Sequence, residues 1–192
     1  MEHPFIRSHN GSAFAVCVLF MLAALPAGAD PSGDVRVAAV KLAGASSYEM
    51  TFTTAGKTAT IDVIKPNTRR LRLQQGEFIF IDSVMYGKQP GRGWMKMPMS
   101  AAPGVSRFYD FVGRFPTSWA ASSMHVTDVG TLKAGGEAMH AYRATDNGSL
   151  MLIYVAGDGY IHRVEVSALS TRSDGYFRFS KFNAVPPIHA PL

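Results

Sequence analysis

Histidine side chains are the first candidates for acid–base chemistry in this sequence. His125, His140, His162 and His189 are spread along the chain, and none has a carboxylate at a local spacing that indicates a catalytic dyad. The sequence lacks the G-x-S-x-G motif of serine hydrolases, the H-E-x-x-H motif of zinc peptidases and a glycine-rich phosphate loop. A triad assembled only in space stays open, but the missing motifs favour a protein that is not an enzyme.

Methionines at alternate positions are the second chemical candidate. Met95, Met97 and Met99 would place their thioethers on one face of a strand, and thioethers are soft ligands that suit Cu(I). The alternative is an apolar stripe, because methionine fills irregular gaps in a core or a lipid cavity. Soft-metal sites normally add cysteine or closely spaced histidine, which this segment lacks, so the apolar stripe is favoured. We therefore expect neither a metal nor a cofactor.

The first thirty residues have the pattern of a targeting segment. The apolar run 13–25 follows a weakly basic start and precedes the small residues Ala27-Gly28-Ala29, as in a secretory signal peptide. The run is shorter than the roughly 20 residues that span a bilayer, so a retained anchor is the less favoured alternative. We expect cleavage of residues 1–29, a periplasmic location, and one domain over residues 30–192. That domain contains no cysteine, so it must be stable without disulfides.

Four cations between residues 65 and 72 form a basic cluster that could bind phosphate. Its members are Lys65, Arg69, Arg70 and Arg72. Export and the lack of aromatic residues alternating with these charges argue against nucleic acid as a partner. Transient contact with lipid head groups at a membrane surface and a plain solvated strand face both remain open.

Apolar and polar residues alternate through most of the chain, which predicts β-strands joined by turns. Only 17% of the 192 residues are charged and 47% are hydrophobic, which excludes a disordered chain. A short helix ended by Gly44 should come first, followed by a hairpin and by shorter extended segments between residues 71 and 97. A second block of strands is expected over residues 126–132, 138–145, 150–155, 161–167 and 176–182. The expected fold is α+β, with about nine or ten antiparallel strands in a strongly curved sheet.

Large apolar side chains occur at positions that would share one face of this sheet. On the strands they are Tyr48, Met50, Phe52, Phe78, Phe80, Met139, Tyr154, Phe177 and Phe179. Between residues 105 and 119 a second set follows helical spacing: Phe108, Phe111, Phe115 and Trp119. An apolar face left open costs about 25 cal/mol per Å², so this helix is expected to cover the sheet. Plain core packing and a core that an acyl chain partly replaces both fit the pattern.

Three consecutive segments carry a resemblance to a known family. They are residues 64–72 (IKPNTRRLR), residues 76–82 (GEFIFID) and, after Met85-Tyr86, residues 93–98 (GWMKMP). Their order, after a signal peptide, a short helix and an aromatic hairpin, resembles the LolA-like superfamily, which includes the outer-membrane lipoprotein carrier and periplasmic lipoprotein-sorting proteins. The chain is similar to a distant member of that superfamily.

The resemblance implies an unclosed antiparallel β-barrel, a half-barrel whose concave face is covered by helices. It also implies that an arginine on a sheet strand anchors the helical lid or contacts a ligand head group. Arg69, Arg70 and Arg72 lie on the corresponding strand, and Arg69 shares a strand face with Leu71 and Leu73, which favours it.

The sequence therefore predicts a periplasmic carrier or binding protein for a hydrophobic ligand, a lipid or an acylated molecule, held between a curved sheet and a helical lid. The alternative is a non-enzymatic periplasmic sensor of the same fold that binds an envelope protein partner. In either case we expect a monomer that performs no chemistry.

Overall fold

The structure, a computed structural model, describes residues 30–88, 90–101, 109, 112–114, 117–118, 124–146, 149–168 and 175–192. The expected signal peptide, residues 1–29, lies outside the described residues. None of the helices in the described part of the chain is long and apolar enough to cross a bilayer.

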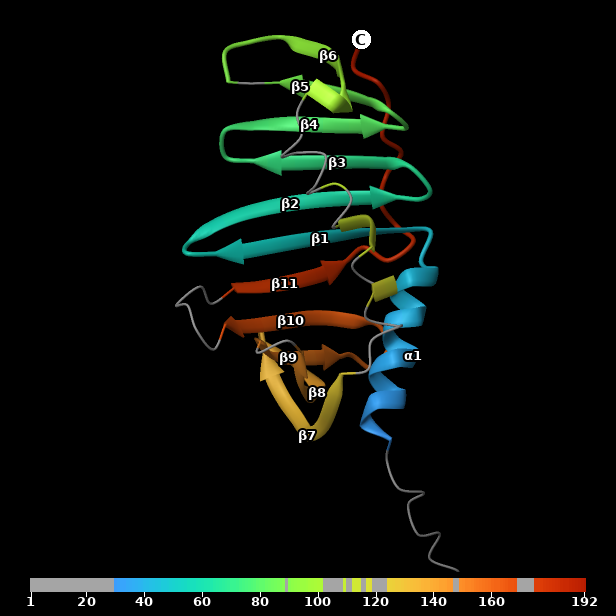
Figure 1. Ribbon diagram of the computed structural model, residues 1–192, viewed down its shortest axis with the longest axis vertical. Coiled ribbons are helices and arrows are strands. Elements are labelled where there is room, and N and C mark those ends of the chain that lie inside the picture. Colours follow the sequence, from blue (N-terminus) through green and yellow to red (C-terminus); the bar gives the residue numbers. More distant parts are fainter. Residues whose placement is uncertain are drawn as a thin grey trace, which may run out of the picture.

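One helix, one short 3-10 turn and eleven strands have defined bounds, and a few further helical residues are described between residues 109 and 118 (Figure 1). Helix α1 spans Pro31–Gly44 and the 3-10 turn η1 spans Met99–Ala101. The first six strands are β1 (Ser47–Thr54), β2 (Lys57–Ile64), β3 (Thr68–Leu73), β4 (Gly76–Ile81), β5 (Val84–Lys88) and β6 (Trp94–Pro98). The remaining five are β7 (His125–Ala134), β8 (Glu137–Asp146), β9 (Ser149–Val155), β10 (Ile161–Ala168) and β11 (Gly175–Ser180).

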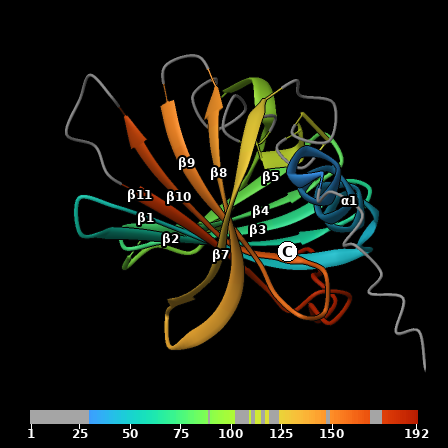
Figure 2. The same ribbon diagram turned by 90° about the horizontal axis from the view of Figure 1, so that it is seen from below.

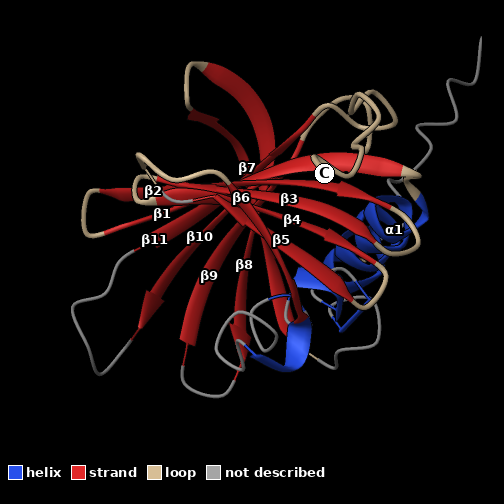
Figure 3. Ribbon diagram, turned by 90° about the horizontal axis from the view of Figure 1, so that it is seen from above, coloured by secondary structure: helices blue, strands red, loops and turns tan. Residues whose placement is uncertain are grey.

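All eleven strands belong to one antiparallel sheet with the order β6-β5-β4-β3-β2-β1-β11-β10-β9-β8-β7. Neighbouring strands are mostly consecutive hairpins, and the exception is the central pair, in which β1 lies against β11. The outer strands β6 and β7 do not pair with each other, so the sheet stays open. Viewed along the long axis, the strands fan out around a strong twist (Figures 2 and 3). The prediction of an unclosed antiparallel half-barrel is confirmed.

Helix α1 packs on one side of this fan, against β7, β9 and β10 (Figure 2). Pro31 stands in its first turn, where a missing N–H costs nothing, and the backbone N–H of Ala45 closes its last turn. Val35, Ala38, Ala39 and Leu42 are buried in the main core together with strand residues such as Met50 and Ile153. We call the face of the sheet that α1 contacts the concave face, and the opposite face the convex face.

Strand register sorts the side chains between these two faces, because successive residues point to opposite sides. Across the sheet Met50 pairs with Ile61 and Phe179, and Ile61 pairs with Leu71, so these buried residues share the concave face. Alternate positions such as Glu49 on β1 lie on the convex face. A separate convex cluster of Ile79 and Tyr86 is covered by Ile188 of the C-terminal tail.

Charged residues of the convex face connect β1, β2, β3 and the tail. Arg72 bridges Glu49 and Asp62 at N–O distances of 3.2 and 3.0 Å, and Lys181 Nζ lies 2.8 Å from Glu49 Oε2. Burial disfavours the ionised form of Glu49, but the hydrogen bonds and charges of Lys181, Ser180 and Arg72 outweigh it and lower its pKa below 4.5.

This lowered pKa predicts a specific loss of stability in acid. A carboxylate with a depressed folded-state pKa stabilises the fold above its unfolded pKa, and the contribution is lost as pH falls through the folded pKa. We expect Glu49→Gln to lower the urea midpoint at pH 7, and we expect the gap to the wild type to narrow progressively between about pH 5 and pH 3. A gap of constant size across this range would contradict the assignment.

Candidate functional site

The centre of the concave face is built by the two strands that come from opposite ends of the chain. Tyr48, Met50 and Phe52 on β1 lie beside Phe177 and Phe179 on β11, and all five are on the concave face. The rings of Phe52 and Phe177 stack at 4.6 Å between centroids, and those of Tyr48 and Phe179 meet at 6.1 Å. Tyr48, Met50 and Phe179 are each no more than 2% exposed, so this apolar surface is covered in the described state.

Strand β4 extends the apolar face toward β6. Phe80 is buried and Phe78 is half-buried, and both pack with the main core. Met85 on β5 pairs with Met97 on β6, where Met97 and Met99 pack against the same core. Met95, the third member of the methionine stripe, is 42% exposed.

Two residues predicted for this face, Met139 and Tyr154, lie on the convex face instead. The register pairs Tyr154 with Ala141 and places Ile153 next to Val164 of the core. Met139 and Tyr154 belong to a small separate cluster, and the Tyr154 hydroxyl donates to Glu165 Oε2 at 3.2 Å. The prediction was wrong because β8 and β9 carry apolar residues on both faces, so alternation alone does not say which set faces the core.

The segment between β6 and β7 supplies helical residues over the concave face. The predicted cover residues Phe108, Phe111, Phe115 and Trp119 lie outside the described residues. Those that are described, Tyr109, Val112–Arg114, Thr117 and Ser118, are helical. Val112 is 1% exposed within the main core, and the Tyr109 ring lies 5.3 Å from that of Phe80. Sequence reasoning missed Tyr109, although its spacing of three residues from Val112 places both on one helix face.

Arg69 connects this segment to the sheet. It sits on the concave face between Val63 of β2 and Phe80 of β4, and it is only 9% exposed. Its guanidinium carbon lies 3.8 Å from the centroid of the Tyr109 ring. A Cβ atom added at Gly113 would come within 2.6 Å of Arg69 Nη2, so glycine at this position leaves room for the guanidinium. We call the described helical residues 109, 112–114, 117 and 118 the lid segment; two of them, Tyr109 and Gly113, lie against the Arg69 guanidinium.

The other two arginines of the strand point away from this site. Arg72 is held by Glu49 and Asp62 on the convex face. Arg70 Nε lies 3.4 Å from Glu77 Oε1, close enough for ion pairing but not aligned as a hydrogen bond. Of the three arginines considered as a lid anchor or head-group contact, Arg69 is thus the one on the concave side.

A cavity of about 320 Å³ opens beside Arg69. Helix α1, strands β1 to β3 and the lid segment all contribute to its wall: Ala43, Tyr48, Val63, Lys65, Pro66, Arg69, Gly113 and Thr117. Burial lowers the pKa of Lys65, whose Nζ donates to the carbonyl of Ala43 at the end of α1. Burial raises the pKa of Tyr48 to about 12, against the pull of the Arg69 charge, so this phenol is neutral at physiological pH.

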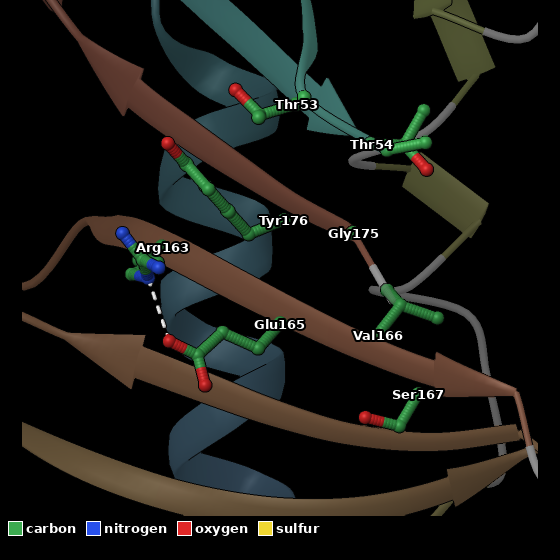
Figure 4. Close-up of a pocket in the computed structure, with 10 residues that line it drawn as sticks. Thr53, Thr54, Arg163, Glu165, Val166, Ser167, Gly175 and Tyr176 are labelled. Carbon is green, nitrogen blue, oxygen red and sulfur yellow. Dashed lines mark hydrogen bonds and ion pairs between the residues drawn. The ribbon is translucent and has the colours of Figure 1, made fainter. Parts of the chain in front are cut away.

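A second cavity, about 330 Å³, lies on the other side of the sheet near the ends of β1, β10 and β11 (Figure 4). Arg163 stacks on the Tyr176 ring at 3.9 Å and its Nε donates to Glu165 Oε1 at 2.8 Å. The two charged residues of this second cavity, Arg163 and Glu165, therefore neutralise each other. In the concave cavity, by contrast, neither Lys65 nor Arg69 has a carboxylate partner among the described residues.

The histidines form two surface pairs that sequence reasoning missed. His140 Nε2 lies 2.8 Å from Asp128 Oδ1, and His162 Nε2 lies 3.0 Å from Asp158 Oδ2, four residues away. Both aspartates also accept a backbone N–H two residues further on, which ties them to turns and bulges. Within the described ranges, no three His, Cys, Asp or Glu side chains come together to hold a metal ion.

Comparison with known proteins extends this picture at the level of the fold. No family model matches the chain, and no curated protein matches it in sequence. Among solved structures, lipoprotein LppX of Mycobacterium tuberculosis is 15% identical and has a TM-score of 0.59, with 84% of this chain and 99% of LppX covered. LprF of Mycobacterium bovis is 14% identical with a TM-score of 0.62, and the match covers 84% of this chain and 96% of LprF.

Identities this low establish a shared fold and leave the activity to be argued from the site. The match runs over most of this chain and nearly all of both relatives, so it concerns the whole half-barrel rather than one hairpin. The open eleven-stranded sheet with helical residues on its concave side agrees with it. The chain has the LolA-like fold.

Proposed function

We propose that this protein is a non-enzymatic periplasmic binding protein that carries a lipid or an acylated molecule between its concave face and the lid segment. In this proposal, residues 1–29 direct export and are removed. The observation that carries it is the apolar concave face, whose cover near Arg69 is a separate chain segment rather than another strand. The lid segment can move without breaking the backbone hydrogen bonds between the strands of the sheet, so an acyl chain can take its place on the concave face.

Arg69 acts as the lid anchor in this proposal. Its charge lies over the Tyr109 ring, a contact worth about 0.5–2 kcal/mol, which is strong enough to favour the closed state and weak enough for a ligand to replace. The aromatic side chains of β1, β4 and β11 form the apolar surface that an acyl chain would contact, chiefly Tyr48, Phe52, Phe78, Phe80 and Phe177. The fold of lipoprotein LppX and of LprF is consistent with this arrangement.

Ligand retention tests the proposal directly. We expect native mass spectrometry of the gently purified mature protein to show adducts of lipid mass, or the lipid-free protein to bind Nile red that a fatty acyl ligand displaces. Protein that is reproducibly free of lipid and binds no displaceable apolar probe would contradict the proposed function.

Substitution of two separate glycines by alanine tests whether the lid segment retains the bound probe. Gly113→Ala places a methyl group 2.6 Å from Arg69 Nη2, which must shift, and we expect release of bound Nile red to become faster. Gly157→Ala is the matched control, because a Cβ there meets no atom within 4 Å. Equal release rates for the two variants would show that the contact of Arg69 with the lid segment does not retain the probe.

A further inference from the structure

The concave cavity has an unusual charge balance for an apolar binding site. Two of its eight lining residues, Lys65 and Arg69, are cations, and none of the eight is acidic. Tyr48 and Thr117 add hydroxyl groups, while the remaining wall is apolar apart from the backbone. Its volume, about 320 Å³, falls at the lower end of the range of small-molecule sites, about 300–1,000 Å³.

Arg69 is the group whose environment is incomplete. The side chain is more than nine-tenths buried, and its Nε and Nη1 atoms have no hydrogen-bond partner among the described residues. The Tyr109 ring covers one face of the guanidinium but offers no acceptor to its N–H groups, which lie in the guanidinium plane. A buried guanidinium without an anion is costly, and its planar fork matches the two oxygens of a carboxylate or phosphate.

The neighbouring side chains that line the cavity supply no anion, and none of them is a hydrogen-bond partner of Arg69 Nε or Nη1. The Tyr48 phenol stays protonated because its pKa is about 12. Lys65 is itself a donor, and the Thr117 hydroxyl donates to the carbonyl of Arg114 at 2.9 Å. Arg69 therefore presents a guanidinium without an acidic partner among the described residues, at the edge of an apolar surface.

We propose that the ligand is an acidic amphiphile, whose carboxylate or phosphate head group pairs with Arg69 while its acyl chain runs along the concave face. This inference rests on the proposed function and specifies the chemical class of its ligand. Arg69 lies between Val63 and Phe80 on the neighbouring strands, and Leu71 is the next residue on the same face of β3. An acyl chain attached to a head group at Arg69 would therefore contact apolar side chains from its first carbons. Lys65, which lines the same cavity, adds positive charge.

The test compares acidic and neutral ligands of the same chain length. Displacement of Nile red from the lipid-free mature protein is measured with palmitate, monopalmitoyl lysophosphatidic acid, methyl palmitate and monopalmitoylglycerol. Acetate and inorganic phosphate test whether the anion suffices alone. We expect one or both acidic lipids to bind about 10- to 100-fold more tightly than their neutral counterparts, as one or two charge-assisted hydrogen bonds allow. Tighter binding of palmitate would identify a carboxylate as the head group, and tighter binding of the lysophosphatidic acid would identify a phosphate.

Variants on the two faces of β3 assign this preference to one residue. Arg69→Gln is expected to reduce the ratio of acidic to neutral affinity to about threefold or less, and a cooperative urea transition shows that the variant is folded. A weaker hold on the lid affects both kinds of ligand, so it does not by itself change this ratio. Arg69→Lys should keep part of the preference, because the charge remains but the planar fork is lost. Arg70→Gln, on the convex face, should keep all of it.

Each contrary outcome has a separate meaning. Equal affinities of acidic and neutral ligands in the wild type, or a preference that survives Arg69→Gln, would overturn the acidic amphiphile and leave the proposed function standing. Binding of inorganic phosphate as tight as that of the lysophospholipid would overturn it in favour of a free anion. If no acyl ligand of either kind binds, the proposed function itself fails.

Discussion

Replacing Arg69 by methionine is expected to raise the free energy of unfolding of the ligand-free protein by about 1–3 kcal/mol. The guanidinium is buried, its Nε and Nη1 atoms have no hydrogen-bond partner within the described part of the chain, and a buried charge in this state costs several kcal/mol. Methionine has a similar length and no charge, and it loses only the cation–π contact with Tyr109, about 0.5–2 kcal/mol. The desolvation cost is the larger of the two, so the substitution should stabilise the fold.

Urea unfolding at pH 7 measures this effect, with Arg70→Met as the matched control on the opposite face of the same strand. Because Arg70 is partly exposed and pairs loosely with Glu77, its replacement should change stability by less than about 1 kcal/mol. A clear loss of stability in the Arg69 variant would mean that the guanidinium is already compensated in the absence of ligand. A gain would identify Arg69 as a residue that is costly to the fold.

The largest loss of stability is expected from Phe179→Ala, about 3–5 kcal/mol. Phe179 is 1% exposed, it packs against the Tyr48 ring, and it lies beside Met50 at the junction of β1 and β11. Removal of a buried phenylalanine combines lost transfer free energy with the cost of a cavity. An effect of this size is a large part of the stability of a typical domain, so the variant should be close to unfolding at 37 °C.

Arg178→Ala is the natural control for this measurement, because the neighbouring side chain on β11 is exposed on the convex face. Its substitution should change the free energy of unfolding by no more than about 0.5 kcal/mol. Similar losses for the two variants would show that the central strand pair is sensitive to any substitution and would argue against a packed concave core at this position.

Much of the fold could be predicted because its strands are local and alternate in polarity. Residues 48–53 and 59–63 alternate cleanly, and the structure pairs them as β1 and β2. The pairing of β1 with β11 could not be derived from the alternation, because it joins residues about 130 positions apart, such as Glu49 and Ser180. Register between distant strands depends on the whole sheet rather than on any local pattern.

The candidate site was predictable where one face of a strand was clearly apolar. Arg69 shares its face with Leu71, which the structure buries, so its concave position followed from alternation alone. The positions of Met139 and Tyr154 did not follow, because both faces of β8 and β9 carry apolar residues. The positions of Gly113 against Arg69 and of Thr117 in the wall of the same cavity depend on how the lid segment packs, which no spacing in the sequence encodes.

The central position of the β1–β11 pair has a consequence for how the chain folds. All other strand pairs are hairpins or near neighbours in sequence, so two half-sheets can form early, one from each end of the chain. Joining them requires closure of a loop of about 120 residues, an entropic step that is typical of slow-folding topologies. Until that step, β1 and β11 are both bare edges, and bare edges invite pairing with other chains. The two half-sheets are therefore most exposed to aggregation just before they meet.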